Sequence, residues 1–210
     1  MCAANVPSNP LAITLPTGAA TAMTERLSPH AFNHPAILLA GTVDQDMYKS
    51  FRTQLDAAPA GGLIVVELST LGGDPEVARM MGEDVRFHHD LEPERRFVFL
   101  GKSAVYSAGA TFMSFFVREN RYLTRGTRLL IHERRLEKNL RLSGPLSACF
   151  GPVEAVLSEI RASMEIQREG FASLAKSSSV SPNELERRAA SDWYVEAQEA
   201  CSLGLVEAVI

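Results

Sequence analysis

One serine in the sequence stands where a hydroxyl could be turned into a nucleophile. Ser107 lies where an apolar strand pattern gives way to a buried helix pattern, among the small residues of the segment from Gly101 to Ala110. A serine at such a junction presents its hydroxyl at a helix N-terminus, beside backbone N–H groups that are free to bind an oxyanion. A helix-capping serine has the same surroundings, so this segment alone does not separate a nucleophile from a cap.

Two further features favour the nucleophile. His132 follows Ser107 by 25 residues and ends the apolar run Leu129-Leu130-Ile131, so it can face the same strand-end surface and take the serine proton. The Gly72-Gly73 turn follows the preceding long strand, where a backbone N–H could complete an oxyanion hole with the N–H of Ala108. The spacing therefore indicates a Ser–His pair capable of acyl transfer.

Strand and helix patterns that alternate from Ala36 to His132 would position these groups. The run 63–68 is β-branched and apolar, as is typical of a parallel strand that is covered on both faces. Asp44 is expected to cap a helix in which Met47 and Phe51 recur on one side. This alternation predicts an α/β fold with parallel strands and right-handed crossovers.

The sequence becomes mainly helical after His132. We expect a long amphipathic helix over about 153–176, followed by a helix whose capping box begins at Ser181. A last helix near 196–203 and a closing strand over 205–210 complete the chain. The long helix carries an apolar stripe formed by Val156, Ile160, Met164 and Phe171.

Length and composition limit the classes of partner. The chain of 210 residues fits one domain, residues 35–210, preceded by a proline-containing irregular arm over 1–34. A formal charge of −4 disfavours a nucleic-acid partner, and no apolar run approaches the roughly 20 residues of a membrane span. Three scattered cysteines and a start without a secretory signal pattern favour free thiols and a cytoplasmic location.

No cofactor is expected. The cluster His88-His89-Asp90 lies at an expected helix end, where cations interact favourably with the helix dipole, so it is interpreted as structural and not as a metal site. The chain contains no GxxxxGK[ST] phosphate loop. We therefore predict neither a metal nor a nucleotide.

The order of four motifs resembles that of the Clp peptidase family, the proteolytic subunits of ATP-dependent bacterial proteases. In that family a Ser-Pro-Gly-Gly turn precedes a Gly-x-Ala-x-Ser-Met-Gly-Ala motif, an Arg-containing segment that ends in Ile-His, and a carboxy-terminal Glu-Ala…Gly-Leu-Val-Asp. The matching segments here are Ser69 to Gly73, Gly101 to Ala110, Arg121 to His132, and Glu199 to Glu207. The resemblance covers roughly residues 36–210.

The resemblance implies a Clp/crotonase-type superhelix of β-β-α units with a protruding helical handle. It implies a serine endopeptidase in which Ser107 attacks the peptide carbonyl, His132 transfers the proton, and the N–H groups of Gly73 and Ala108 hold the oxyanion. Its substrate would be a peptide or an unfolded protein, and its subunits would form a homo-oligomeric ring. The first 34 residues do not match the axial loops that meet the family's ATPase, so an unfoldase partner is not indicated.

Two departures from the family bear on catalysis. When residues 192–195 are matched to the family's Asp-Phe-Phe-Met-like segment, the acid position of the triad falls on Arg188, which cannot orient an imidazole as a carboxylate does. Asp192 is then the candidate acid and Glu186 a weaker one, or Ser107 and His132 act without an acid. After His132 the charged run 133–138 replaces the family's Gln-Pro and Gly-rich strand, which puts the peptide-binding edge and the contact between rings in doubt.

Three functional hypotheses follow. The first is a Clp-like serine endopeptidase. The second is a catalytically impaired relative that serves as a structural or regulatory ring subunit, which Arg188 and the run 133–138 would explain. The third is a crotonase-type acyl-CoA enzyme, which uses paired backbone N–H groups for a thioester oxyanion, and which the Ser107/His132 pair disfavours.

Overall fold

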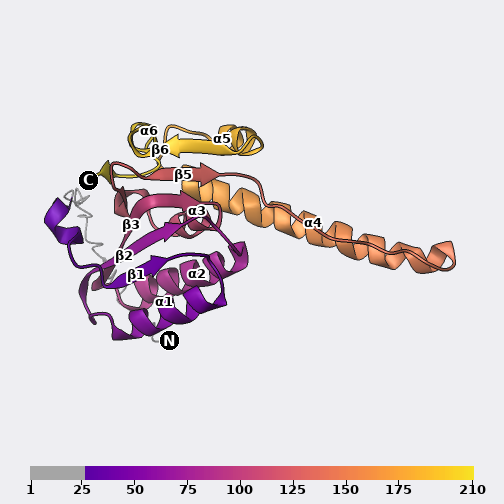
Figure 1. The fold of residues 1–210 in the computed structure, drawn as a ribbon, viewed down its shortest axis with the longest axis horizontal. Helices are drawn as coiled ribbons and strands as arrows, with labels where there is room; N and C mark the ends of the chain where they lie inside the picture. Colours follow the sequence, from indigo (N-terminus) through magenta and orange to yellow (C-terminus); the bar gives the residue numbers. More distant parts are fainter. Residues whose placement is uncertain (1–26) are drawn as a thin grey trace, which may run out of the picture.

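A seven-stranded, mostly parallel sheet forms the centre of the molecule. The computed structural model describes residues 27–210 (Figure 1). The strands are β1 (Ile37–Ala40), β2 (Gly62–Thr70), β3 (Arg95–Tyr106), β4 (Arg121–Leu123), β5 (Arg128–Ile131), β6 (Trp193–Glu196) and β7 (Ala208–Val209). Their order is β1-β2-β3-β4-β7, with β5 paired to β3 and β6 paired antiparallel to β5.

Helices cover the sheet and extend beyond it. They are α1 (Gln45–Ala57), α2 (Pro75–Leu91), α3 (Ala108–Met113), α4 (Leu146–Ala175), α5 (Pro182–Ala189) and α6 (Ala197–Ser202), with short 3-10 turns at Pro29–Phe32 and Arg118–Asn120. Figure 1 shows α1 and α2 side by side against β1 and β2, whereas α5 and α6 lie with β6 at the opposite end of the body. The mixed α/β architecture and the projecting helix agree with the fold predicted from the sequence.

Side-chain caps fix where several helices begin. The Asp44 carboxylate accepts hydrogen bonds from the N–H groups of Asp46 and Met47. At the start of α2, the Asp74 carboxylate accepts from the N–H groups of Glu76 and Val77. The Ser181 hydroxyl accepts from the N–H of Glu184. Each cap satisfies backbone donors that would otherwise have no partner in the first helical turn, and the caps expected at Asp44 and Ser181 are confirmed.

The long strand β3 divides between two neighbours, and this division positions the end of β5. Its residues Phe99–Gly101 pair with β4, whereas Ala104–Tyr106 pair with β5. Ser103 lies between the two sets with a positive φ of 60°, and the register with β2 shifts over the same stretch. Consequently β5 ends beside the residues that follow β3.

The carboxy-terminal half differs in detail from the sequence prediction. The strand β6 was not predicted, and the closing strand is reduced to Ala208–Val209. The helix that starts after Ser107 ends at Met113. The helix α4 starts at Leu146, before the expected start near residue 153, and contains Pro152. Most of the arm expected over 1–34 falls outside the described residues.

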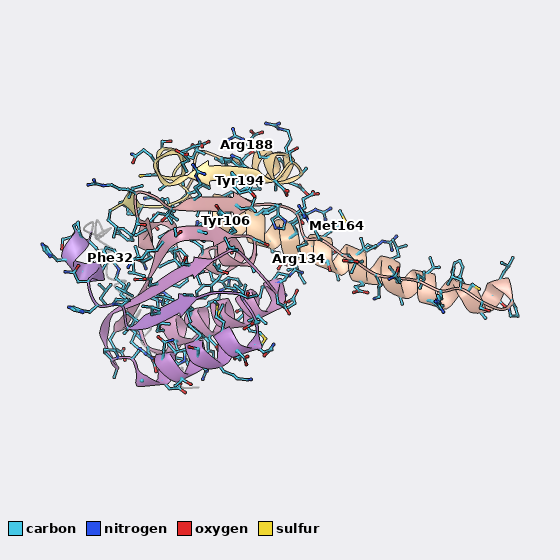
Figure 2. The ribbon with its side chains drawn as sticks, in the orientation of Figure 1. Phe32, Tyr106, Arg134, Met164, Arg188 and Tyr194 are labelled. Atoms are coloured by element: carbon cyan, nitrogen blue, oxygen red, sulfur yellow. The ribbon has the colours of Figure 1, made fainter. Side chains whose placement is uncertain are left out.

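The helix α4 projects from the body as a handle. Residues 132–145 form neither helix nor strand and run from the body alongside α4 to its distal end, where the helix begins (Figure 1). Figure 2 shows Arg134 and Met164 where this segment and the helix leave the body. Within residues 27–210, no helix is both long and apolar enough to cross a membrane.

Candidate active site

Ser107 lies at the turn between β3 and α3 in a strained backbone conformation. Its φ of 54° and ψ of −112° place it outside the favoured regions for a residue with a side chain. The turn is held because the Ser107 N–H donates to the carbonyl of Leu130 (2.9 Å) and its own carbonyl accepts from Thr111 (3.1 Å). A non-glycine residue persists in such a conformation only when its surroundings fix it, and such residues cluster at functional sites.

The glycine turn after β2 packs directly against Ser107. A methyl group added at Gly72 would lie 2.9 Å from the Cβ of Ser107, and one at Gly73 would lie 2.3 Å from the carbonyl oxygen of Val43. Both glycines have positive φ, 115° and 145°. Thr70 Oγ1 fixes the turn by accepting from the N–H of Gly72 (3.0 Å). Only glycine fits at these two positions, as expected where backbone must approach a site closely.

The two amides predicted to bind an oxyanion lack protein acceptors. Within residues 27–210, neither the N–H of Gly73 nor that of Ala108 donates a hydrogen bond to another protein group. Ala108 is the first residue of α3, where backbone N–H groups have no intrahelical partner. Both donors are therefore available to a ligand oxygen.

His132 follows β5 and faces the same pocket as Ser107. Its Nδ1 lies 2.6 Å from the carbonyl oxygen of Glu133. A carbonyl oxygen only accepts, so Nδ1 must carry the hydrogen and Nε2 of the neutral ring is left as an acceptor. This is the tautomer that a general base requires, although no hydrogen bond joins Ser107 Oγ to the ring among the described residues.

The pocket that contains Ser107 and His132 lies between α2, α3 and the body end of α4. Its inner wall includes Phe115, Phe171 and Leu174, and its rim carries charged groups from α2. Arg86 on that rim lies over the ring of Phe115 at 4.8 Å and pairs with Glu83 at 3.0 Å. The pocket therefore offers an apolar interior beside the candidate nucleophile.

Arg121 joins α3 to α4, two of the helices that line this pocket. Its guanidinium, 1% exposed, donates to the carbonyl oxygens of Phe116, Ser114, Ser173, Leu174 and Leu205 at 2.7–3.3 Å. Four of these carbonyls, those of Ser114, Phe116, Ser173 and Leu174, lie at or just after the carboxyl ends of α3 and α4, where a cation is favoured. Burial lowers the pKa of Arg121 to about 10, which leaves it charged at neutral pH.

Among the described residues, no hydrogen bond or ion pair joins a candidate acid to His132. Both carboxylate oxygens of Asp192 accept from one nitrogen of Arg135, at 2.9 and 2.8 Å. Arg188 pairs with Glu184 at 2.6 Å and lies over the ring of Trp193 at 4.7 Å. The weaker candidate acid, Glu186, lies 4.0 Å from Arg168. The pocket therefore brings together Ser107 and His132, with the glycine turn packed against Ser107, whereas none of the predicted acids lines it.

Contacts from the segment after His132 were not predicted. The Arg134 N–H donates to Oε1 of Gln167 on α4 (2.7 Å), and its guanidinium pairs with Glu76 on α2 (2.5 Å). Farther out, Lys138 pairs with Glu159. The charged run 133–138 is thus tied by side chains to α2, to α4 and to Asp192 just before β6. Its charge was visible in the sequence, but its partners are 21–58 residues away along the chain.

Comparison with known proteins gives a consistent result. A family model described as Clp protease matches residues 20–210. The chain is 25% identical over 191 residues to the ATP-dependent Clp protease proteolytic subunit 2 of Pseudomonas aeruginosa, an alignment that covers 90% of this chain and 87% of that protein. Its fold is similar to that of a solved structure, a point mutant of ClpP1 from Listeria monocytogenes, with a TM-score of 0.65, 19% identity and coverage of 83% of this chain and 90% of that one.

Proposed function

The chain belongs to the Clp protease family, and we propose that it is a serine endopeptidase with Ser107 as nucleophile and His132 as general base. The observation that carries this proposal is the strained strand-to-helix turn at Ser107, which opens onto the same pocket as His132. Residues that only cap a helix do not require such a backbone conformation.

The chemistry follows from the atoms at the site. Nε2 of His132 takes the Ser107 proton as Oγ bonds to the carbonyl carbon of the scissile peptide, and the N–H groups of Gly73 and Ala108 stabilise the resulting oxyanion. When the C–N bond breaks, His132 returns the proton to the leaving amine. Water then attacks the acyl-enzyme, with His132 again acting as base, and Ser107 is regenerated.

The proposed substrate is a peptide or an unfolded protein. The apolar wall formed by Phe115, Phe171 and Leu174 suits an apolar side chain next to the scissile bond. The lining of the pocket includes His132 and Arg134 from the segment that follows β5, so a peptide is proposed to approach from that side.

We also propose that the chain forms a homo-oligomeric ring. On α4, Leu146, Phe150, Val153, Leu157, Ile160 and Met164 are all exposed, 37–89% of each residue. Their spacing alternates between three and four residues, the pattern of helices that pack against one another. An apolar surface of this kind on a soluble chain indicates an interaction site.

A second candidate function is a catalytically impaired ring subunit. It is favoured by the engagement of Asp192 with Arg135, which leaves His132 without a carboxylate. A neutral carbonyl can hold the imidazole in one tautomer, but it carries no charge to stabilise the imidazolium that forms in the reaction.

Peptide hydrolysis by the Ser107→Ala variant tests the proposal. We expect cleavage of a fluorogenic peptide and of unfolded casein to fall by several orders of magnitude, because the nucleophile is lost, while the melting temperature stays close to that of the parent. The exposed Ser202 provides a matched Ser→Ala control that should retain full activity. Equal turnover in the Ser107→Ala variant and the parent would refute the assignment of the nucleophile.

A further inference from the structure

Asp192 directly precedes β6, and its carboxylate is held by Arg135. The antiparallel pairing of β5 with β6 ends at Ile131 opposite Trp193. His132 and Asp192 are the residues next to this last pair, one following β5 and one preceding β6. Asp192 has a positive φ of 53° at this point, and its carboxylate contacts Arg135.

The segment 133–135 binds both side chains of a potential His–Asp pair. Glu133 supplies the carbonyl oxygen that accepts from Nδ1 of His132, and Arg135 supplies the guanidinium that holds Asp192. A carboxylate is a stronger acceptor than a neutral carbonyl for a ring that becomes charged. The present arrangement therefore keeps the stronger acceptor away from the imidazole.

The contact that holds Asp192 is weak enough to exchange. The side chains of Arg135 and Asp192 are 73% and 46% exposed. Ion pairs this exposed are screened by salt and contribute little to stability, because ordering two side chains offsets most of the attraction. The carboxylate can thus leave the guanidinium without unfolding of the surrounding structure.

From these contacts we propose that Arg135 is a positioning residue that competes with His132 for the carboxylate of Asp192. In the arrangement described here Asp192 is on Arg135, and the Ser–His pair works without an acid. When Asp192 leaves Arg135, it replaces the Glu133 carbonyl as the acceptor for Nδ1–H of His132 and completes a triad. Segment 133–135 would thereby set the activity of the site. This inference rests on the proposed function of Ser107 and His132.

The Arg135→Gln variant tests the competition. Removing the guanidinium should raise the rate of Ser107 acylation by a fluorophosphonate about two- to fivefold, the range that corresponds to losing one exposed ion pair. Arg128→Gln is the matched control, because Arg128 forms an ion pair of similar exposure with Glu196 (3.1 Å) across the same two strands. The control should react at the parental rate.

A double-mutant cycle separates the release of Asp192 from a general effect of removing charge. In an Asp192→Asn background, Arg135→Gln should have no effect on acylation, because there is no carboxylate to release. An equal gain in both backgrounds would overturn the proposal.

The crystal structure of the Arg135→Gln variant provides a readout that does not depend on activity. We expect a carboxylate oxygen of Asp192 within about 3 Å of His132 Nδ1. If the carboxylate remains remote and acylation equals that of the parent, the inference fails while Ser107-dependent labelling still supports the proposed function. If Asp192 reaches His132 but no variant is labelled, the positioning role stands and the peptidase assignment fails.

Discussion

The two sides of the candidate site are built in different ways. The inner side, formed by the Ser107 turn, the glycine turn at residues 70–73 and Arg121, is held by buried backbone contacts at the centre of the sheet. The outer side, formed by residues 132–145 and α4, is held by exposed ion pairs and presents exposed apolar residues. The nucleophile and the oxyanion donors belong to the inner side, whereas the partners of the candidate acid belong to the outer side.

The difference indicates where the site can change. Displacing a buried backbone contact leaves polar groups without partners, at about 1–3 kcal/mol each, whereas breaking an exposed ion pair costs about 1 kcal/mol or less. The inner side should therefore keep its geometry while the outer side rearranges. On this view the protein has a fixed nucleophile and an adjustable histidine environment.

The largest effect on activity is expected from a substitution on the inner side. Gly73→Ala places a methyl group against the backbone of Val43 at a φ that alanine avoids, and it should displace the Gly73 N–H. Loss of one oxyanion donor lowers turnover by about 10²–10³-fold, so we expect at least this fall in peptide hydrolysis. The Gly126→Ala control has open space around the added methyl group and should be neutral. Parental activity in the Gly73 variant would exclude a role for this turn.

The next largest effect on activity is expected from replacing the candidate acid, which is held by the outer side. If Asp192 orients His132 during turnover, Asp192→Asn should lower hydrolysis by about 100-fold or more, because an amide in place of the carboxylate favours the wrong tautomer and removes the negative charge. If Ser107 and His132 act alone, the change should have little effect. Arg188→Asp is the complementary variant, and a rise in its activity would instead favour the position of Arg188 for the acid.

Arg121 tests how firmly the inner side is built. Arg121→Met removes the donor shared by five carbonyl oxygens, and we expect the free energy of unfolding to fall by about 3 kcal/mol or more. Arg125, which is exposed, provides the matched Arg→Met control. Urea denaturation measures both variants, and equal stabilities would show that Arg121 does not tie α3 to α4.

The smallest effect on the fold is expected on α4. Leu157→Ser lies on the exposed apolar surface, so the stability of the subunit should change by no more than about 0.5 kcal/mol. Association should weaken, because the same surface is proposed to pack against other copies of the chain. Light scattering at micromolar concentration should show a smaller mass for this variant than for the Ala155→Ser control. A monomeric parent would contradict the proposed assembly.

The sequence predicted local features better than contacts between distant segments, and the reason is physical. Caps at Asp44 and Ser181, the buried run 63–68 and the glycine turn depend on local conformation and periodicity, which neighbouring residues determine. The strand β6 could not be read locally, because four residues between two helices become a strand only by pairing with β5. The contact between Arg135 and Asp192 joins residues 57 positions apart on the surface, where many partners compete.

The assignments within the site rest on different observations and stay predictions. Ser107 and His132 share a pocket, and among residues 27–210 the Gly73 and Ala108 amides have no protein acceptor, which supports their proposed roles. Asp192 was proposed because it follows the family's acid position by one helical turn. The structure adds that it precedes β6, whose pairing with β5 ends one residue before His132, and that Arg135 holds its carboxylate. Neither fact was visible in the sequence.

Covalent labelling of the assembled protein tests the central claim most directly. The parent and the variants Ser107→Ala and His132→Ala would be incubated with a fluorophosphonate, and the modified peptide identified by mass spectrometry. We predict that the parent is modified at Ser107, that the Ser107 variant is not modified, and that the His132 variant reacts far more slowly because its base is missing. An unlabelled parent, or labelling at another serine with Ser107 unmodified, would contradict the account.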